Sequence, residues 1–560
     1  MSPLWILLLG MVIVVGGVLV LRIHAFLALI LGALVVALLT PRTSIYHHEL
    51  RTNAVSVVSV DAEDQTVTLG AGSSDGVLVG TIFTVLRLDP ADEAYQQVAV
   101  LQVERADGNQ AVARLISVET TFRMAKDDLV ILPAQERAAH TVSAQSIGEH
   151  VATGFGRTCM SIGILIAMAA IIGKCLLDSG GAERIVLAAR RALGEERAPV
   201  AFLGSGFLLG IPVFFDTVFY LLVPLAKAMR VRTGKDYVLY ILTIVAGASI
   251  AHSLVPPTPG PLFVASELDV DIGLMMLGGC AVGLVAIAVG YLYAQWANRR
   301  WDIPLRPSAE LTLAELEAMN NRDERTLPAL GVSLLPILLP VVLIAGNTVL
   351  NLVIQDVPSV EIPGWLAGTR SVVNLLGNKN VALVIAGMIA LLMLARQKRN
   401  SRADLAAAVQ VALASGGIII LITAAGGAFG HVLRQTGISS QLQDLIPATQ
   451  LALLPAAFGI TTLVRIAQGS ATVAMITAVG IFAPIAAVGG LAFHPLYLAL
   501  AIGCGSKPYP WMNDSGFWII STMSGFTEEE TLKTASVVIS LMGVVGLVVT
   551  LLGAWLFPLV

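Results

Sequence analysis

The sequence predicts an α-helical polytopic membrane protein that carries a small all-β extramembrane insert. Its residues are 56% hydrophobic and only 13% charged, and its mean hydropathy is +0.81. Many windows of about 20 residues carry almost no charge, and that length lets a helix cross a hydrocarbon core of roughly 30 Å. Residues 43–140 differ, because charges are frequent there. The net charge of -4, with basic residues scattered in short loops, argues against a nucleic-acid partner.

The first expected element is an N-terminal transmembrane hairpin over residues 1–42. Two apolar runs, Leu4–Leu21 and Phe26–Leu39, follow each other closely, with Arg22 and His24 at the turn between them. We do not expect a cleaved signal peptide, because no basic segment precedes the first run and a second run follows at once.

The second element is a β-rich insert over residues 43–140. β-branched residues alternate with polar ones in five runs, which is the pattern of half-buried strands; the runs are Val55–Val60, Thr66–Leu69, Thr81–Leu88, Val98–Val103 and Ala111–Ile116. Turn-forming segments separate these runs as hairpin loops would; they are Asp61–Asp64, Gly70–Gly76 and Asp107–Asn109. The glycine-rich loop lacks the Gly-Lys-Ser/Thr ending of a phosphate loop, so we interpret it as a strand connection.

The rest of the chain divides into two halves, residues 145–297 and 328–560, joined by a linker over 298–327. We expect about ten full spans plus two re-entrant hairpins. Polar segments interrupt two apolar stretches that are long enough for a pair of half-helices: Gly210–Asp216 lies within 198–226, and Arg465–Thr472 lies within 449–488. A broken span follows each hairpin, with its break at His252–Pro261 in the first half and at Gly503–Trp518 in the second.

The two halves repeat each other weakly, and loop charge predicts opposite orientations for the two repeats. Gly173–Gly180 parallels Gly430–Gly437 before the hairpins, and Val223–Leu225 parallels Ala483–Ile485 after them. Loops flanking the first hairpin are basic and should be cytoplasmic; they contain Arg184, Arg190, Arg191, Arg197, Lys227, Arg230, Arg232 and Lys235. Loops flanking the second hairpin, at about 435–448 and 489–493, carry no Lys or Arg. The repeats should therefore be inverted, with the linker cytoplasmic and both termini and the β insert on the periplasmic side.

Four interrupted segments resemble the signature segments of the gluconate permease family. They are Gly210-Ile-Pro-Val-Phe-Phe-Asp216, His252-Ser-Leu-Val-Pro-Pro-Thr-Pro-Gly-Pro261, Gln468-Gly-Ser-Ala-Thr-Val473 and Asn513-Asp-Ser-Gly-Phe-Trp518. The resemblance covers residues 1–42 and about 145–560. It implies proton-coupled import of gluconate or a related sugar acid into a bacterium across the inner membrane, by an inverted-repeat protein of the ion-transporter superfamily. It also implies a homodimer and elevator-type motion.

The sequence departs from that family pattern at three places. The β insert is an addition. Thr258 stands where many members have His in Pro-Pro-His-Pro-Gly-Pro, which removes a side chain that titrates near neutral pH. Lys507 stands where familiar gluconate carriers have apolar residues. The exact sugar acid is therefore open.

Paired interrupted segments in the two halves of a transporter point to its binding site. Helix N-termini at hairpin tips offer N–H groups and a positive dipole end to an anion. The expected substrate-binding residues are Gly469, Ser470, Thr472, Ser253, Thr258, Lys507, Asn513 and Ser515. Arg465 is a further cation that either binds the substrate carboxylate or neutralises an acidic neighbour.

The expected ion-coupling residues are Asp216, Asp514 and His252. A carboxylate in apolar surroundings either pairs permanently with a cation or holds a proton tightly enough to carry it. Both alternatives apply to Asp216 and Asp514, with Lys507 and Arg465 as the available partners. His252 either titrates during transport or only binds carbonyl groups freed by the proline-rich break.

The leading hypothesis is a secondary active transporter that imports gluconate or a related sugar acid with H⁺. The alternatives are a Na⁺-coupled carrier of another small organic anion and a membrane sensor that uses the outer β insert. An enzyme is not expected, because the sequence has no His-Glu-x-x-His motif. The four cysteines have no metal-ligand spacing, so we expect no metal and no cofactor. Substrate, coupling ion, membrane lipid and a second copy of the chain are the expected partners.

Overall fold

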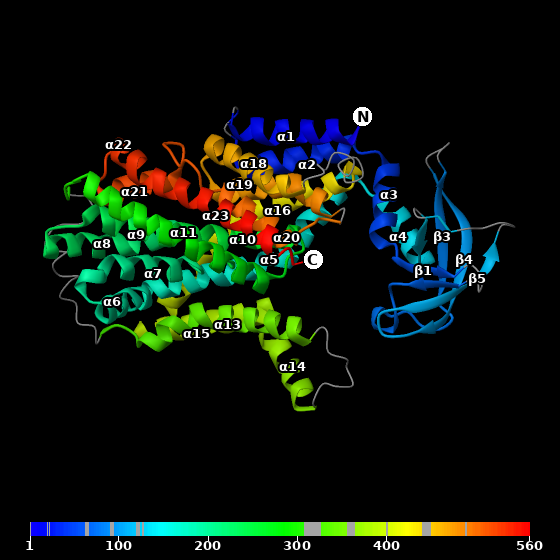
Figure 1. Cartoon of the computed structure of the whole chain (residues 1–560), viewed down its shortest axis with the longest axis horizontal. Coiled ribbons are helices and arrows are strands. Elements are labelled where there is room, and N and C mark those ends of the chain that lie inside the picture. Colours follow the sequence, from blue (N-terminus) through cyan, green and yellow to red (C-terminus); the bar gives the residue numbers. More distant parts are fainter. Residues whose placement is uncertain are drawn as a thin grey trace. The chain divides into compact units, whose positions relative to one another are not determined.

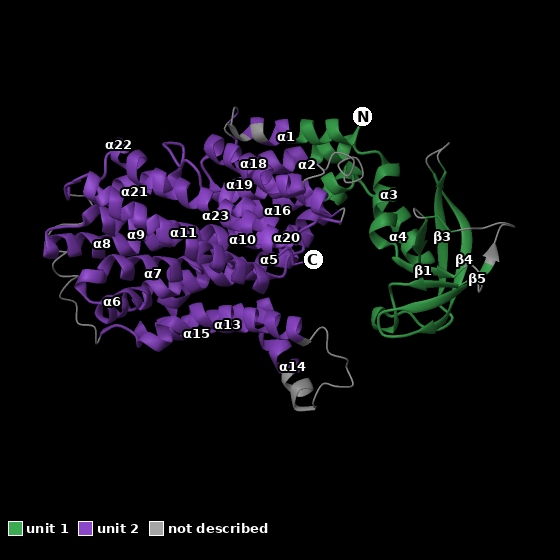
Figure 2. Cartoon of the chain, in the orientation of Figure 1, with its two compact units in different colours: residues 1–10, 34–151, 431–441 green, residues 11–33, 152–430, 442–560 purple. Residues whose placement is uncertain are grey.

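The computed structural model describes residues 2–19, 21, 23–61, 66–89, 94–118, 124–125, 128–306, 326–354, 364–398, 401–438, 450–487 and 490–559. The chain forms two compact units, which Figure 2 colours separately. Unit 1 contains residues 1–10, 34–151 and 431–441; unit 2 contains residues 11–33, 152–430 and 442–560. Most of the linker, and with it the cytoplasmic helix that Glu310–Glu317 would form, lies outside the described residues.

Unit 1 contains a six-stranded antiparallel sheet with the strand order β1-β2-β5-β4-β3-β6. The strands are β1 Val57–Asp61, β2 Thr66–Leu69, β3 Ile82–Asp89, β4 Ala94–Ala106, β5 Ala111–Val118 and β6 Leu129–Ile131. The sequence predicted the first five strands, and β1–β2 and β4–β5 are the expected hairpins. Their inward side chains form a closed apolar core around Phe83, Val85 and Leu101, each 0% exposed.

One predicted hairpin in this sheet is wrong. Gly70–Gly76 connects β2 to β3, but β2 pairs with β1 and β5 rather than with β3. The loop instead contains a short 3₁₀ turn, Ser73–Asp75, and the backbone N–H groups of Ser73 and Ser74 donate to the carbonyls of Asp107 and Gly108. It therefore crosses the β4–β5 turn, because the alternating apolar pattern places β2 beside β5.

The helices of the two units account for most of the chain (Figure 1). Those before the linker are α1 Pro3–Leu19, α2 Ala25–Leu39, α3 Arg42–Asn53, α4 Pro133–Ser143, α5 Ile147–Asp178, α6 Gly181–Leu193, α7 Ala198–Gly210, α8 Phe215–Thr233, α9 Tyr237–Leu254, α10 Pro259–Glu267 and α11 Ile272–Arg300. Those after it are α13 Leu330–Ile354, α14 Gly364–Leu376, α15 Lys379–Gln397, α16 Arg402–Arg434, α18 Leu453–Gln468, α19 Ala471–Ala486, α20 Pro495–Gly505, α21 Ser515–Ser524, α22 Glu528–Thr531 and α23 Val537–Leu556.

Eight helical segments within the described residues are long and apolar enough to cross a membrane, or up to nine if α2 and α3 form one bent span. The sequence predicted about ten. The N-terminal hairpin accounts for part of this difference, because α1 has 17 residues and α2 has 15, which is shorter than an ordinary span.

The two hairpins and the two broken spans are present as helix pairs with a break between them. α7 and α8 are separated at Ile211–Phe214, and α18 and α19 at Gly469–Ser470. α9 ends at Leu254 and α10 begins at Pro259, whereas α20 ends at Gly505 and α21 begins at Ser515. Proline at the first helical positions of α7, α10 and α20 suits a helix start, where its missing N–H costs no hydrogen bond.

The helices of unit 2 pack in a pattern that repeats between the halves. In the first half α7 packs on α9, and in the second half α18 packs on α20. The contacts between halves are reciprocal, because α8 packs on α21 and α19 packs on α10. Each hairpin therefore contacts the second part of the other half's broken span. α11 and α23 pack on each other behind α9 and α20.

Candidate functional site

A cavity of about 340 Å³ lies in unit 2 where the hairpin tips and the helix breaks meet. This volume falls within the roughly 300–1,000 Å³ typical of pockets for small molecules. The N-termini of four helices line it, at Phe215–Thr217 of α8, Pro259 of α10, Ser470–Thr472 before and in α19, and Asp514–Gly516 before and in α21.

The four N-termini differ in the charge that they carry. Each helix start contributes a partial positive charge. The starts of α8, α19 and α21 also offer N–H groups that lack partners within the helix, whereas Pro259 and Pro261 give α10 no N–H at its first and third positions. α8 has Asp216 in its first turn, and Asp514 is the N-cap of α21. The first turns of α10 and α19 carry no acidic residue. The N-terminus of α19 therefore favours an anion, whereas the N-termini of α8 and α21 already hold two carboxylates.

The tip of the second hairpin depends on Gly469. This residue ends α18 with φ = 84°, and its N–H donates to the Arg465 carbonyl at 2.8 Å. A Cβ atom here would lie 2.2 Å from the Asn513 carbonyl oxygen. Only glycine allows both this left-handed conformation and this close approach. Ser470 then caps α19 by accepting from the Val473 N–H at 3.4 Å.

Arg465 and Asp514 form a buried ion pair between α18 and α21. Their exposed fractions are 8% and 4%. The Asp514 Oδ1 atom also accepts from the Gly516 N–H at 2.6 Å and thereby caps α21, and the Arg465 Nη1 group donates to the Gly469 carbonyl. Both oxygens of Asp514 are thus occupied, which favours the permanent pair among the two alternatives for this residue.

Asp216 and Lys507 line the same cavity without such a pair. Among the described residues no cation lies within ion-pair distance of Asp216 and no carboxylate lies within that distance of Lys507. The Lys507 Nζ group donates to the Ser249 carbonyl of α9. His252, one turn after Ser249, has a buried Nδ1 atom with no hydrogen-bond partner in the described part of the chain, and its ring lies edge-on to Phe214 at 6.1 Å.

Eight of the eleven residues that the sequence marked as candidates line the cavity. They are Gly469, Ser470, Thr472, Lys507, Ser515, Asp216, Asp514 and His252. The other three do not line it. The Asn513 side chain donates to the Ile466 carbonyl at 2.7 Å, and the Thr258 hydroxyl donates to the Val255 carbonyl at 2.7 Å. Ser253 is 0% exposed.

Sequence reasoning missed several residues of the cavity wall, chiefly Ser249, Thr217 and Ser506. Ser249 lies within the apolar helix α9, where a single serine is an ordinary packing residue. Its three-residue distance from His252 places both near one face of α9, and this spacing is the only local signal that could have marked it.

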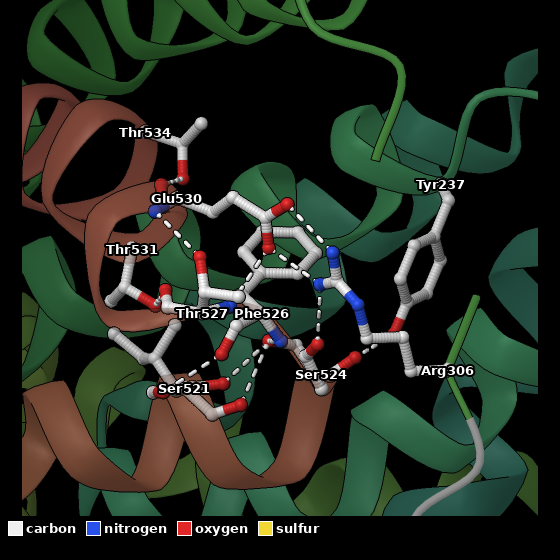
Figure 3. A network of polar contacts seen from close by, with 11 residues as sticks. Tyr237, Arg306, Ser521, Ser524, Phe526, Thr527, Glu530, Thr531 and Thr534 are labelled. Atoms are coloured by element: carbon white, nitrogen blue, oxygen red, sulfur yellow. Dashed lines mark hydrogen bonds and ion pairs between the residues drawn. The ribbon is translucent and has the colours of Figure 1, made fainter. Parts of the chain in front are cut away.

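The other end of α21 is held by a network of polar contacts that reaches the linker (Figure 3). Arg306 donates to both carboxylate oxygens of Glu530, at 2.5 and 2.8 Å, and to the Gly525 carbonyl at 2.8 Å. The Tyr237 hydroxyl donates to the Ser524 carbonyl at 2.5 Å. The hydrogen bonds to Glu530 raise the pKa of the Arg306 guanidinium. α21 is therefore fixed by Asp514 at the cavity and by Arg306 and Tyr237 at its far end.

Comparisons with known proteins agree with this architecture. The family model described as GntP family permease matches residues 110–556; residues 1–42 lie outside this range. An uncharacterized permease of Haemophilus influenzae is 35% identical over 397 residues, which cover 69% of this chain and 78% of that protein. A gluconate permease of Pseudomonas aeruginosa is 33% identical over 401 residues, which cover 71% of this chain and 86% of that protein.

A solved structure shares the fold at low sequence identity. MtrF of Neisseria gonorrhoeae, described with a class of antimetabolite efflux pumps, is 15% identical, with a TM-score of 0.55 over 79% of this chain and 90% of that one. At this identity the likeness concerns the fold alone. Since the family model spans most of the residues, the chain belongs to the GntP permease family of multi-pass membrane transporters.

Proposed function

We propose that this protein is a secondary active transporter that imports gluconate or a related sugar acid by proton symport across the bacterial inner membrane. The observation that carries the proposal is the cavity, which is lined by four helix N-termini, by Lys507 and by two carboxylates. One carboxylate, Asp514, is paired with Arg465, and the other, Asp216, has no cation partner among the described residues. An organic anion fits the acid-free N-terminus of α19, which supplies N–H donors and a positive dipole end, and Lys507 in the cavity wall supplies a positive charge. Ser470, Thr472 and Ser515 then offer hydroxyls to the sugar chain.

Asp216 is the proposed coupling group. Asp514 is neutralised by Arg465, whereas no described cation pairs with Asp216. An unpaired carboxylate inside the membrane is costly. Protonation removes this cost, so the protonated form of Asp216 favours the movement that carries the site from one side to the other. Coupling requires only that the loaded and empty forms are stabilised differently. We propose His252 as a second group that changes its proton occupancy.

The proposed movement is of the elevator type. The hairpins and broken helices contact one another across the halves, which supports their moving as one body while the site alternates between the two sides. Inverted repeats, a cytoplasmic linker and a homodimer complete this proposal and follow from loop charge and from the family resemblance.

The test is uptake of labelled gluconate by proteoliposomes under an imposed pH gradient, acidic outside. We expect accumulation that follows the gradient. Asp216→Asn should lose accumulation and keep gluconate–gluconate exchange, because the substrate still binds. Glu529→Gln, a carboxylate change at an exposed ion pair, is the matched control and should behave as the wild type. Undiminished accumulation in Asp216→Asn would place coupling elsewhere, and accumulation driven by Na⁺ alone would favour the sodium-coupled alternative.

A further inference from the structure

Ser249 is a buried hydroxyl without a hydrogen-bond partner at the wall of the cavity. It is 6% exposed, and its Oγ atom has no hydrogen-bond partner among the residues that the structure describes. Helical Ser and Thr hydroxyls usually donate to a carbonyl one turn earlier. Thr243 on the same helix does so, because its hydroxyl donates to the Leu239 carbonyl at 2.9 Å. Since a buried polar group without a partner is costly, the Ser249 hydroxyl is suited to pair with a ligand.

Lys507 brings a positive charge to the same residue. Its Nζ group donates to the backbone carbonyl of Ser249, and Lys507 is 4% exposed. A lysine ammonium has three N–H donors, and only the bond to Ser249 occupies one of them among the described residues. Two donors remain for an anion in the cavity.

The positions of these two groups match a particular pair of ligand groups. The Lys507 ammonium contacts the backbone carbonyl of Ser249, and the unpaired hydroxyl is the side chain of that same residue. The cation and the hydroxyl are therefore close together. In a 2-hydroxy acid the carboxylate and the hydroxyl stand on adjacent carbon atoms. A carboxylate bound by Lys507 therefore brings the 2-hydroxyl beside Ser249.

We propose that Ser249 and Lys507 form a subsite that selects 2-hydroxy carboxylates, with Lys507 binding the carboxylate and Ser249 binding the 2-hydroxyl. This inference rests on the proposed function, because it requires a hydroxylated acid in this cavity. Specificity follows from the unpaired hydroxyl, since a site that pairs with a ligand hydroxyl discriminates strongly against an analogue that lacks it. Ser249 is thus a specificity residue, and Lys507 is the anchor for any carboxylate.

The test compares gluconate, 2-deoxygluconate and 3-deoxygluconate by calorimetric titration of the full-length protein in lipid nanodiscs. The wild type should bind 2-deoxygluconate roughly tenfold more weakly than gluconate, and more weakly than 3-deoxygluconate. Ser249→Ala should lose roughly tenfold in affinity for gluconate and keep its affinity for 2-deoxygluconate within about twofold. Lys507→Gln should weaken both ligands.

Ser205→Ala is the matched control. Ser205 is also a buried serine, 3% exposed, whose hydroxyl has no partner within the described ranges. It lies on α7, which packs on α9, but it does not line the cavity. This variant should leave the ligand preference unchanged.

Several outcomes overturn the inference. Equal losses for gluconate and 2-deoxygluconate in Ser249→Ala would make Ser249 a packing residue. A wild type that rejects 3-deoxygluconate but accepts 2-deoxygluconate would move the hydroxyl contact elsewhere on the substrate, and this comparison needs no variant. If the wild type binds no sugar acid, the proposed function fails first and the subsite falls with it. If the wild type binds gluconate and both deoxy analogues equally well, the subsite is refuted while the proposed function stands.

Discussion

At the scale of single residues, the site separates two acidic groups that the sequence could not tell apart. Asp216 and Asp514 both interrupt apolar stretches, and both had Arg465 and Lys507 as possible partners. The structure pairs Arg465 with Asp514, which lies 49 positions further along the chain. No local pattern encodes that choice, because it depends on how α18 and α21 meet.

Removing Arg465 should destabilise the fold more than removing both members of the pair. Arg465→Gln leaves a buried carboxylate without its cation, at a cost of about 3–5 kcal/mol. Arg465→Gln combined with Asp514→Asn removes the unpaired charge and should unfold at a higher temperature than the single variant. Thermal unfolding in nanodiscs measures both. Arg105→Gln, at an exposed ion pair of the β insert, should change little. A double variant no more stable than Arg465→Gln would contradict this account.

Gly469→Ala should disrupt the second hairpin tip. The new Cβ would clash with the Asn513 carbonyl oxygen, and the alanine would have to adopt a positive φ. Together these two effects cost more than about 2 kcal/mol. We expect a lower unfolding temperature and loss of uptake. Gly459→Ala is the control, because it lies on the same helix α18 with open space around its Cβ; it should be neutral or slightly stabilising. Equal behaviour of the two variants would argue against a special tip geometry.

At the scale of elements, α21 is a ten-residue helix fixed at both ends. Its N-terminus belongs to the cavity, and its C-terminus is held by Arg306 and Tyr237 (Figure 3). A short helix transmits a shift at one end to the other, since its backbone hydrogen bonds keep it rigid. We therefore expect Arg306 to influence the cavity through α21 without touching a ligand.

Arg306→Gln should raise the KM of uptake by about three- to tenfold with a smaller effect on the maximal rate, because the cavity end of α21 is less well positioned. Arg306→Lys should restore part of the affinity, since lysine replaces a bidentate contact by a point charge. Lys533→Gln breaks an exposed ion pair on the adjoining turn and should leave KM unchanged. A loss of maximal rate and folded protein at constant KM would indicate a merely structural role.

Elements were more predictable from sequence than contacts between them. Gly210, Pro259 and Gly469 are local signals that mark the end or the start of a helix in the structure, and Pro212 lies in the break between α7 and α8. Strands β1–β5 were likewise visible as alternating runs. Ser249 was not, because one serine within an apolar helix carries no signal of the cavity beside it.

At the scale of the whole molecule, loop charge predicts which parts face the periplasm. Ser74 in the β insert and Lys398 in the basic turn after α15 are both exposed. Ser74→Cys should react with a membrane-impermeant maleimide in intact spheroplasts, and Lys398→Cys should react only after the membrane is opened. The wild type, with its four native cysteines, gives the background. Labelling in the opposite order would invert the predicted topology.

The reciprocal packing of hairpins and broken helices also bears on how the protein is made. α8 carries Asp216, and its partner α21 begins roughly 300 residues later, which at about 5–20 residues per second takes about 15–60 s to synthesise. During that interval the cavity that the first hairpin lines does not yet exist. The hairpin meanwhile carries an acidic group in apolar surroundings. Biogenesis of the first half should therefore depend on an insertase or chaperone that shields the hairpin, and a ribosome stalled before residue 515 should leave a nascent chain that proteases degrade.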